Sequence, residues 1–215
     1  MTMMILMLAE FVSMFTAIFV IIDPFAVIPV YLSMTEKLSS IERKLICRKA
    51  ALVSFSILLV FAMSGTTLFN IFGISLPAFQ IAGGLLLLNV GISQLNASRS
   101  RVQPEERLES LEKEDISIFP LATPLIAGPG AISTVVLQSS QISQFQHFFT
   151  LGFAVLAAVF CTYLTLRFAS SLFRFMGKTG LNLLTRIMGI ILTAVAVQFI
   201  INGLTEVVKN FLHHS

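Results

Sequence analysis

Two similar stretches decide the fold of this chain: Asp23-Pro24-Phe25-Ala26-Val27-Ile28-Pro29 and Thr123-Pro124-Leu125-Ile126-Ala127-Gly128-Pro129. Each lies inside a long apolar run, and both keep the spacing Asp/Thr-Pro-x4-Pro, one hundred positions apart. A proline inside a helix removes a backbone hydrogen bond and clashes with the preceding turn, so two prolines five residues apart predict a broken helix. We expect these two breaks to form the working site.

The composition around the two stretches is that of a membrane protein. Of the 215 residues, 56% are hydrophobic and 12% are charged, against about 45–50% and about 25% in soluble domains. A helix needs about 20 apolar residues to cross the hydrocarbon core. Hydropathy predicts six such spans, at residues 3–34, 49–69, 76–96, 117–139, 148–170 and 184–208. The spans are uniformly apolar and do not alternate, which excludes a β-barrel and predicts an all-α membrane protein.

The basic residues predict the orientation of the spans. Thirteen of the 14 Lys and Arg residues lie in or beside the loops that follow the first, third and fifth spans. They are Lys37, Arg43, Lys44, Arg48, Lys49, Arg99, Arg101, Arg107, Lys113, Arg167, Arg174, Lys178 and Arg186, and only Lys209 lies elsewhere. Cytoplasmic loops carry the excess of basic residues, so both termini are predicted to be periplasmic. Without a basic residue before Lys37, the first span is expected to be retained.

A charged segment divides the chain into two similar halves. We expect a first three-span repeat at 1–96, a charged cytoplasmic linker at 97–117 and a second three-span repeat at 118–215. Each half has a broken span, a plain span and a glycine-containing span, the last at Ile81–Leu86 and Ile187–Leu192. Since three is odd, the second half enters the membrane from the opposite side. The expected fold is therefore six helices in two inverted repeats, with helices 1 and 4 broken, as in many secondary transporters.

The breaks offer a binding chemistry that needs no basic side chain. Asp23 and Thr123 each precede a proline, and these are residue types that begin helices. The free N–H groups and the positive dipole end of a helix start hold anions such as carboxylates. Gly128 and Gly130 would let a ligand approach the backbone of the second break. Whether each helix restarts at its first or its second proline stays open.

Asp23 is the ionisable side chain that lies well inside a predicted span. A charge at the bilayer centre costs about 2.5–3.5 kcal/mol on insertion scales, so Asp23 is expected to face a cavity or a partner, or to be protonated. Three roles stay open: binding a substrate ammonium, carrying a coupling proton, or capping the half-helix. Glu10 is expected near the outer surface as a solvated carboxylate. For Gln94, as for other polar residues in the spans, we expect interhelical hydrogen bonding.

Other functional classes lack their characteristic groups. Cys47 and Cys161 have no CxxC spacing and are read as packing residues. His147 is expected in a loop, and His213 and His214 stand at the C-terminus, so no metal cluster is predicted. Neither HExxH nor a serine–lysine or serine–histidine pair at one membrane depth is present, so we expect no enzyme. No cofactor and no nucleic-acid partner are expected.

At its two breaks the chain resembles the MarC/SnatA family of bacterial and archaeal inner-membrane proteins. The likeness rests on Ile22-Asp23-Pro24, on residues 72–79 continuing into 81–84, and above all on residues 119–132, Phe-Pro-Leu-Ala-Thr-Pro-Leu-Ile-Ala-Gly-Pro-Gly-Ala-Ile. The resemblance implies a six-span fold with inverted repeats. It also implies transport of small neutral amino acids such as glycine and alanine, coupled to protons.

The first motif departs from the family pattern. The family's usual sequence is D-P-x-G-N-x-P, whereas this chain has Ala26 and Val27 in place of Gly-Asn. The first break therefore lacks an open backbone and a side-chain amide, and if these hold substrate in relatives, this chain prefers a different or more apolar ligand or has lost transport. The second motif is intact.

The resulting prediction is a multi-pass inner-membrane transporter of small neutral amino acids, with its substrate site at the two breaks. Asp23 would bind the ammonium or carry the proton. The predicted substrate-binding residues are Asp23, Pro24, Pro29, Thr123, Pro124, Gly128, Pro129, Gly130, Ser133 and Thr134. Two alternatives stay open: an uncoupled small-solute permease or channel, and a membrane scaffold that binds a partner through the 97–117 linker.

Overall fold

The computed structural model describes residues 2–95, 115–140 and 145–213. All regular structure in these residues is helical, which confirms the predicted all-α fold. The elements are α1 (Thr2–Ile22), α2 (Pro24–Met34), α3 (Ser40–Phe72), α4 (Leu76–Leu95), the irregular segment η1 (Ser117–Ile126), α6 (Pro129–Ser140), α7 (Phe145–Arg167) and α8 (Ala169–His213). Most of the predicted 97–117 linker lies outside the described residues.

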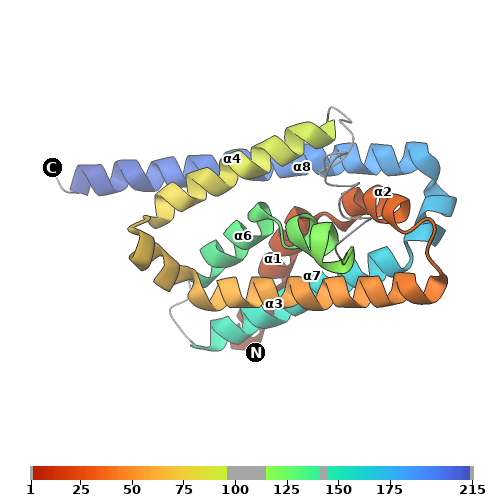
Figure 1. Ribbon diagram of the computed structural model, residues 1–215. Coiled ribbons are helices and arrows are strands. Elements are labelled where there is room, and N and C mark those ends of the chain that lie inside the picture. Colours follow the sequence, from red (N-terminus) through yellow and green to blue (C-terminus); the bar gives the residue numbers. More distant parts are fainter. Residues whose placement is uncertain (1, 96–114, 141–144, 214–215) are drawn as a thin grey trace.

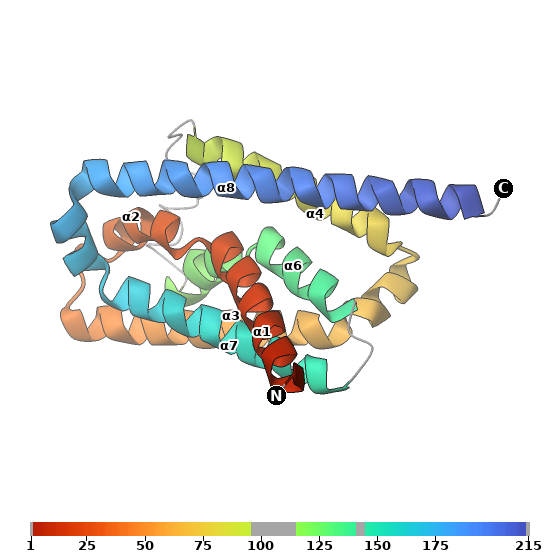
Figure 2. The same ribbon diagram turned by 180° about the vertical axis from the view of Figure 1, so that it is seen from behind.

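The helices form two layers (Figures 1 and 2). In one layer α4 and α8 lie side by side along one edge of the molecule, and in the other α3 and α7 lie along the opposite edge. Between the layers lie α1 and α6, which contact each other, with α1 packed against α7 and α6 against α3. The short helix α2 contacts both α7 and α8. The interior of this arrangement therefore contains both proline-rich motifs.

Glycines hold α4 and α8 together. A Cβ added at Gly91 would lie 2.4 Å from Thr193 Oγ1, and one added at Gly84 would lie 2.8 Å from the carbonyl oxygen of Ala196. Toward the other end of the pair, a Cβ at Gly203 would lie 2.9 Å from the carbonyl oxygen of Pro77. Since real Cβ atoms do not approach other atoms so closely, no larger residue fits here. The antiparallel pair is thus a close small-residue contact of the kind common between membrane helices.

In the second layer, α3 and α7 each bury one stripe of residues. On α7 the buried positions Leu151, Ala154, Val155, Ala158, Val159, Thr162 and Leu166 recur every three or four residues. On α3 the buried positions Cys47, Ala50, Ser54, Leu58 and Ala62 have a similar period and are mostly small. Residues at this spacing share one face of a helix. Both stripes face the interior, and the large side chains on the opposite faces are exposed, as a lipid environment requires.

Hydropathy located the spans well. Within the described residues, five helical segments are long and apolar enough to cross a membrane, or six if the bent pair of η1 and α6 counts as one span. The helices extend further than the predicted spans at α3, which begins at Ser40, and at α8, which begins at Ala169. Charged residues end a hydropathy window but not a helix: a capping box of Ser39 and Glu42 begins α3. Inside α8, Gly177 has φ 65° and ψ 179°, a left-handed backbone that favours glycine and interrupts the helix.

Candidate functional site

The first break is a single residue, Asp23, between α1 and α2. Its N–H donates to the carbonyl of Phe19 at 3.0 Å, which ends α1, and its φ of 48° and ψ of 67° turn the chain into a left-handed conformation. Aspartate is one of the few residues that adopt this conformation readily. Its Oδ1 then accepts a hydrogen bond from the N–H of Ala26 at 3.4 Å and caps α2. The helix therefore restarts at Pro24, the first proline of the motif.

Pro29 does not mark a break. It lies inside α2, and its ring is exposed. α1 and α2 together form one apolar span, Met7–Met34. The predicted break is therefore present, and the question of which proline restarts the helix is answered in favour of Pro24: Pro29 continues α2, where its exposed side tolerates the missing N–H. Pro24, by contrast, is buried at the start of α2, where its missing N–H would have had no partner.

The second break is longer than the first, and its helix restarts at the second proline of the motif, Pro129. Phe119 and Thr123 have extended backbone angles inside η1, and the helix restarts only at Pro129 as α6, bent by 58° from η1. The N–H of Ala127 donates to the carbonyl of Ala122 at 2.8 Å and closes η1. Thr123 is exposed and begins no helix. The two motifs thus use the same spacing differently, since α2 begins at the first proline and α6 begins at the second.

Both breaks lie at a similar depth. α2 has 11 residues and runs from the first break to the basic loop before α3, a length of about 16 Å at 1.5 Å per residue. α6 has 12 residues and runs from the second break toward the opposite face, about 18 Å. A hydrocarbon core is about 30 Å thick. Each break is therefore near the middle of the membrane, reached from opposite sides.

The two breaks meet at α4. A Cβ added at Gly130 would lie 2.5 Å from Leu87 Cδ2 and 3.2 Å from Ile21 Cγ2. Ile21 is two residues before Asp23, so the start of α6 touches the end of α1 at the first break. At Gly128 an added Cβ would lie 2.4 Å from the carbonyl oxygen of Pro124, which shows that the turn into α6 has no room for a side chain. The structure therefore brings together the two motifs that the sequence places one hundred residues apart.

Asp23 has a partner that was not among the predicted site residues. The amide Nε2 of Gln94 on α4 donates to Asp23 Oδ2 at 2.7 Å, and both side chains are buried, with 0% and 7% exposure. The interhelical hydrogen bond expected for Gln94 is confirmed. Among the described residues, Gln94 Oε1 has no hydrogen-bond partner. A signal was available in the sequence, because Gln94 continues the stripe Gln80, Gly83, Gly84, Leu87, Gly91 that α4 buries.

Ser133 and Thr134 lie one turn into α6 and are buried with 4% and 1% exposure. Ser133 packs against Gly83 of α4: a Cβ added at Gly83 would lie 3.1 Å from the Ser133 Oγ. The hydroxyl of Thr134 donates to the carbonyl of Gly130 within the same helix at 2.9 Å. Asp23, Ala127 and Gly128 are also buried, whereas Gly130 is partly exposed and Thr123 and Pro129 are exposed. The Asp23 carboxylate is therefore shielded from solvent in this conformation, and a ligand would reach it through a rearrangement of the breaks.

Among the described residues, one ion pair and one histidine–carboxylate contact join helices to one another. At the end of the molecule where α3 begins, the ammonium of Lys49 pairs with Asp115, which also accepts a hydrogen bond from Ser117 at the start of η1. Lys49 and Ser117 lower the pKa of Asp115 from its usual 3.8 to about 2. Elsewhere, Nδ1 of His147 lies 2.9 Å from Oε2 of Glu10 and joins α7 to α1. The loop position expected for His147 is therefore wrong, since α7 begins two residues earlier.

The described residues contain no cluster of three or more His, Cys, Asp or Glu side chains that could hold a metal ion. Cys47 is buried and Cys161 is partly buried, and both are free thiols. The chemistry of the site therefore consists of one carboxylate, one amide, hydroxyl groups and the backbone of two helix starts. These groups suit reversible binding of a small polar ligand.

Comparison with known proteins decides the family. The model of the MarC family of integral membrane proteins matches residues 8–208, nearly the whole chain. The chain belongs to this family. The MarC-type matches at the two breaks, noted above in the sequence, therefore reflect common descent along the full length.

Relatives of this MarC protein occur in archaea and in bacteria. A UPF0056 membrane protein of Methanocaldococcus jannaschii is 39% identical over 92% of this chain and 97% of its own length. Relatives named UPF0056 membrane proteins in Bacillus subtilis and Escherichia coli are 38% and 34% identical, each over 93% of this chain and 96% and 94% of their own lengths. No solved structure matches the chain. The family thus establishes an integral membrane protein, and the site geometry carries the functional argument.

Proposed function

We propose that this MarC-family protein is a secondary transporter of small neutral amino acids, coupled to protons, with its substrate site at the two helix breaks. One observation carries the proposal: two interrupted helices meet at mid-membrane depth beside a buried carboxylate. Interrupted helices at the bilayer midplane are the usual place of the substrate in secondary transporters.

The start of α6 suits the carboxylate of an amino acid. The first N–H groups of a helix, here those of Gly130 and Ala131, have no partner within the helix. Together with the helix dipole they favour an anion. Gly128 and Gly130 keep side chains away from these N–H groups, and Gly130 is partly exposed. The space at the start of α6 suits a small ligand, because Leu87 and Ile21 lie directly against Gly130.

Asp23 and Gln94 suit the ammonium or the proton. A substrate ammonium would donate to the Asp23 carboxylate and to Gln94 Oε1, the buried oxygen that lacks a partner among the described residues. A coupling proton would be carried by the same carboxylate. Since Asp23 already caps α2 and binds Gln94, its structural role favours a second candidate function, an uncoupled permease in which Asp23 neither binds substrate nor titrates.

The packing supports an inverted repeat as the basis of alternating access. A two-fold operation that exchanges α1 with η1, α2 with α6, α3 with α7 and α4 with α8 maps the pair α1–α7 onto the pair η1–α3 and the pair α2–α8 onto the pair α6–α4, and all four pairs are in contact. The same operation maps the contacts α4–α8 and α3–α7 onto themselves. We infer that the two halves rock about the glycine contact between α4 and α8 and open the buried site to each side in turn.

We further propose that the basic side is cytoplasmic, that both termini are periplasmic and that the protein resides in the inner membrane. The charge distribution supports this orientation: Arg43, Lys44 and Arg167 gather at one end of the bundle. Cysteine labelling of single-cysteine variants at Ser75 and Ser170 in intact cells and in inverted vesicles tests it. The proposed orientation requires Ser75 to be labelled from outside and Ser170 from inside.

Reconstituted vesicles test the transport function. Uptake of labelled glycine, alanine and serine is measured with and without a pH gradient. Concentrative uptake that needs the gradient supports the coupled transporter, and flux that only equilibrates the solute supports the permease. Vesicles that show no protein-dependent uptake of any of these solutes would contradict both.

A further inference from the structure

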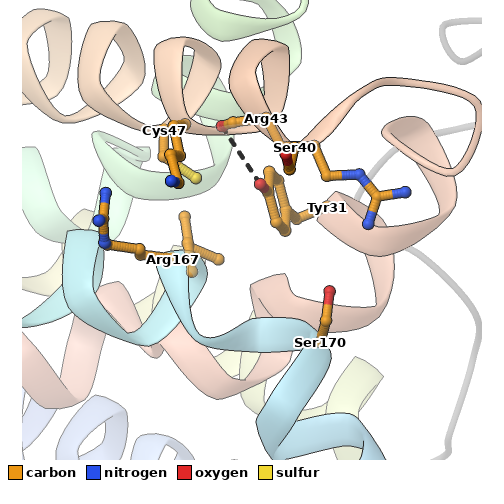
Figure 3. A pocket seen from close by; sticks show the side chains of 8 residues that line it. Tyr31, Ser40, Arg43, Cys47, Arg167 and Ser170 are labelled. Carbon is orange, nitrogen blue, oxygen red and sulfur yellow. Dashed lines mark hydrogen bonds between the residues drawn. The ribbon is translucent and has the colours of Figure 1, made fainter.

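A pocket separate from the helix breaks lies where four helix ends meet. Its volume is about 190 Å³, and it is lined by Tyr31 of α2, by Ser40, Arg43, Lys44 and Cys47 of α3, by Leu166 and Arg167 of α7 and by Ser170 of α8 (Figure 3). The pocket thus joins elements of the first half to elements of the second half. It takes no part in the transport site proposed above.

The lining is cationic and hydroxylic. Three of its eight side chains are Lys or Arg, three carry a hydroxyl group, and no Asp or Glu is among them. The nearby carboxylate of Glu42 accepts a hydrogen bond from the N–H of Ser39 in the capping box of α3. Among the described residues, neither Lys44 nor Arg167 has a carboxylate partner. Positive charge therefore accumulates in the pocket without neutralisation by the described part of the chain.

The three cations are not equivalent. The side chain of Arg43 is directed away from Tyr31 (Figure 3), and its Nε and Nη2 donate to the carbonyls of Leu38 at 3.2 Å and Glu36 at 2.9 Å. Arg43 therefore fixes the loop between α2 and α3. Arg167 donates one hydrogen bond, from Nη1 to the hydroxyl of Tyr163 at 3.1 Å. Lys44 and Arg167 are the cations left to bind a ligand.

The serine hydroxyl groups complete an oxyanion site. Ser40 and Ser170 face the pocket from α3 and α8. Figure 3 shows the Tyr31 hydroxyl in the middle of the pocket, and its one O–H donates to the backbone carbonyl of Arg43 at 3.3 Å, which leaves the serines as the hydroxyl donors. A guanidinium fork, an ammonium and hydroxyl donors form the donor set that binds phosphate oxygens. Pockets for drug-sized ligands measure about 300–1,000 Å³, so this smaller pocket admits a head group and not a large molecule.

We propose that this pocket binds a phosphate group. The group is either the phosphodiester of an anionic phospholipid or a free phosphate, since both present the same oxygens. The position between membrane helices at the end of the bundle where basic residues gather is typical of head-group sites. A bound phosphate would connect α2 and α3 to α7 and α8, and it would stabilise the closed arrangement of these helix ends.

The test uses the purified full chain in a neutral detergent at constant ionic strength, with thermal unfolding as the readout. Phosphatidylglycerol, phosphatidylcholine and inorganic phosphate are titrated separately. The proposal expects a rise of the unfolding temperature with phosphatidylglycerol or with inorganic phosphate. A rise with phosphatidylglycerol alone assigns the site to lipid, and a rise with inorganic phosphate assigns it to the free anion.

Variants decide whether the pocket is responsible. Arg167→Gln and Lys44→Gln are each expected to raise the ligand concentration at the midpoint of the titration by about tenfold or more, because each removes a charge-assisted bond. Arg167→Lys keeps the charge but loses the planar guanidinium, so it should raise this concentration less. The matched control is Arg174→Gln, an exposed basic residue of α8 outside the pocket, which should leave the midpoint unchanged. Unfolding of each variant without ligand shows whether it is folded. The proposal is overturned if neither ligand stabilises the wild type. It is also overturned if Arg174→Gln raises the ligand concentration at the midpoint as much as the pocket variants do.

Discussion

Replacing Gly91 by alanine is predicted to destabilise the protein, although alanine is the better helix former. An added Cβ would lie 2.4 Å from Thr193 Oγ1 and 2.9 Å from the Thr193 nitrogen. The hydroxyl cannot swing aside freely, because it donates to the carbonyl of Gly189 at 2.8 Å. Since carbon atoms pack at about 3.5–4.0 Å, α4 and α8 would have to separate by about 1 Å. Such overpacking costs about 1–3 kcal/mol.

Gly152→Ala is the matched control for this prediction. Gly152 is also in the interior of a helix, α7, but nothing lies within 4 Å of an added Cβ. Alanine improves helix propensity by about 0.8–1.0 kcal/mol at both positions, and this gain cancels in the comparison. The free energy of unfolding in mixed detergent micelles should therefore be about 1–3 kcal/mol lower for Gly91→Ala than for Gly152→Ala. Equal values for the two variants would refute the close α4–α8 contact.

Three further predictions follow from the site and its surroundings. Asp23→Asn should cost less than about 1 kcal/mol of unfolding free energy, because the one oxygen of asparagine still accepts from Ala26 and its amide nitrogen can donate to Gln94 Oε1 once the Gln94 amide is flipped. Asp23→Ala, by contrast, loses a cap worth about 1 kcal/mol and the bond to Gln94. Equal costs of the two variants would argue against both contacts. Gly128→Ala should abolish uptake in vesicles while Gly152→Ala retains it, because the new Cβ would meet the Pro124 carbonyl at 2.4 Å; full activity of Gly128→Ala would exclude a constrained turn. The ion pair of Asp115 with Lys49 should stabilise the protein by about 0.2–1 kcal/mol at neutral pH. Because the pKa of Asp115 in the folded protein is lowered to about 2, this contribution should be lost as the pH falls from about 4 through about 2. A Lys49→Met variant whose stability has the same acid dependence as that of the wild type would contradict this prediction.

Much of the fold could be predicted from the sequence, because the hydropathy that places a helix in the membrane is a property of each segment by itself. Long apolar windows fixed the spans to within a few residues, except where charged residues continue a helix, as in residues 40–48 before the predicted second span. Close packing at Gly83, Gly84 and Gly189 was also predictable in kind, since small residues mark helix contacts in membranes. The partners of these glycines were not predictable, because they lie on other helices: Gly83 packs against Ser133 of α6, Gly84 against Ala196 of α8, and Gly189 against Gly91 of α4.

The details of the breaks could not be predicted. Both prolines of each motif are compatible with a first helical position, so the sequence could not choose between Pro24 and Pro29, or between Pro124 and Pro129. The left-handed backbone of Asp23 decides the first case, and the extended backbone of Thr123 decides the second. The contact between Asp23 and Gln94 joins residues 71 positions apart. Only the packing of α4 across both breaks creates it.

Proton-driven alanine uptake by Asp23→Asn tests the central claim most directly. Wild type, Asp23→Asn and Gly152→Ala are reconstituted at equal protein content and given the same pH gradient with labelled alanine. If the two breaks form one coupled site, wild type and Gly152→Ala concentrate alanine, and Asp23→Asn does not. Concentration of alanine by Asp23→Asn to the wild-type level would contradict the proposed role of the buried carboxylate at the meeting point of the breaks.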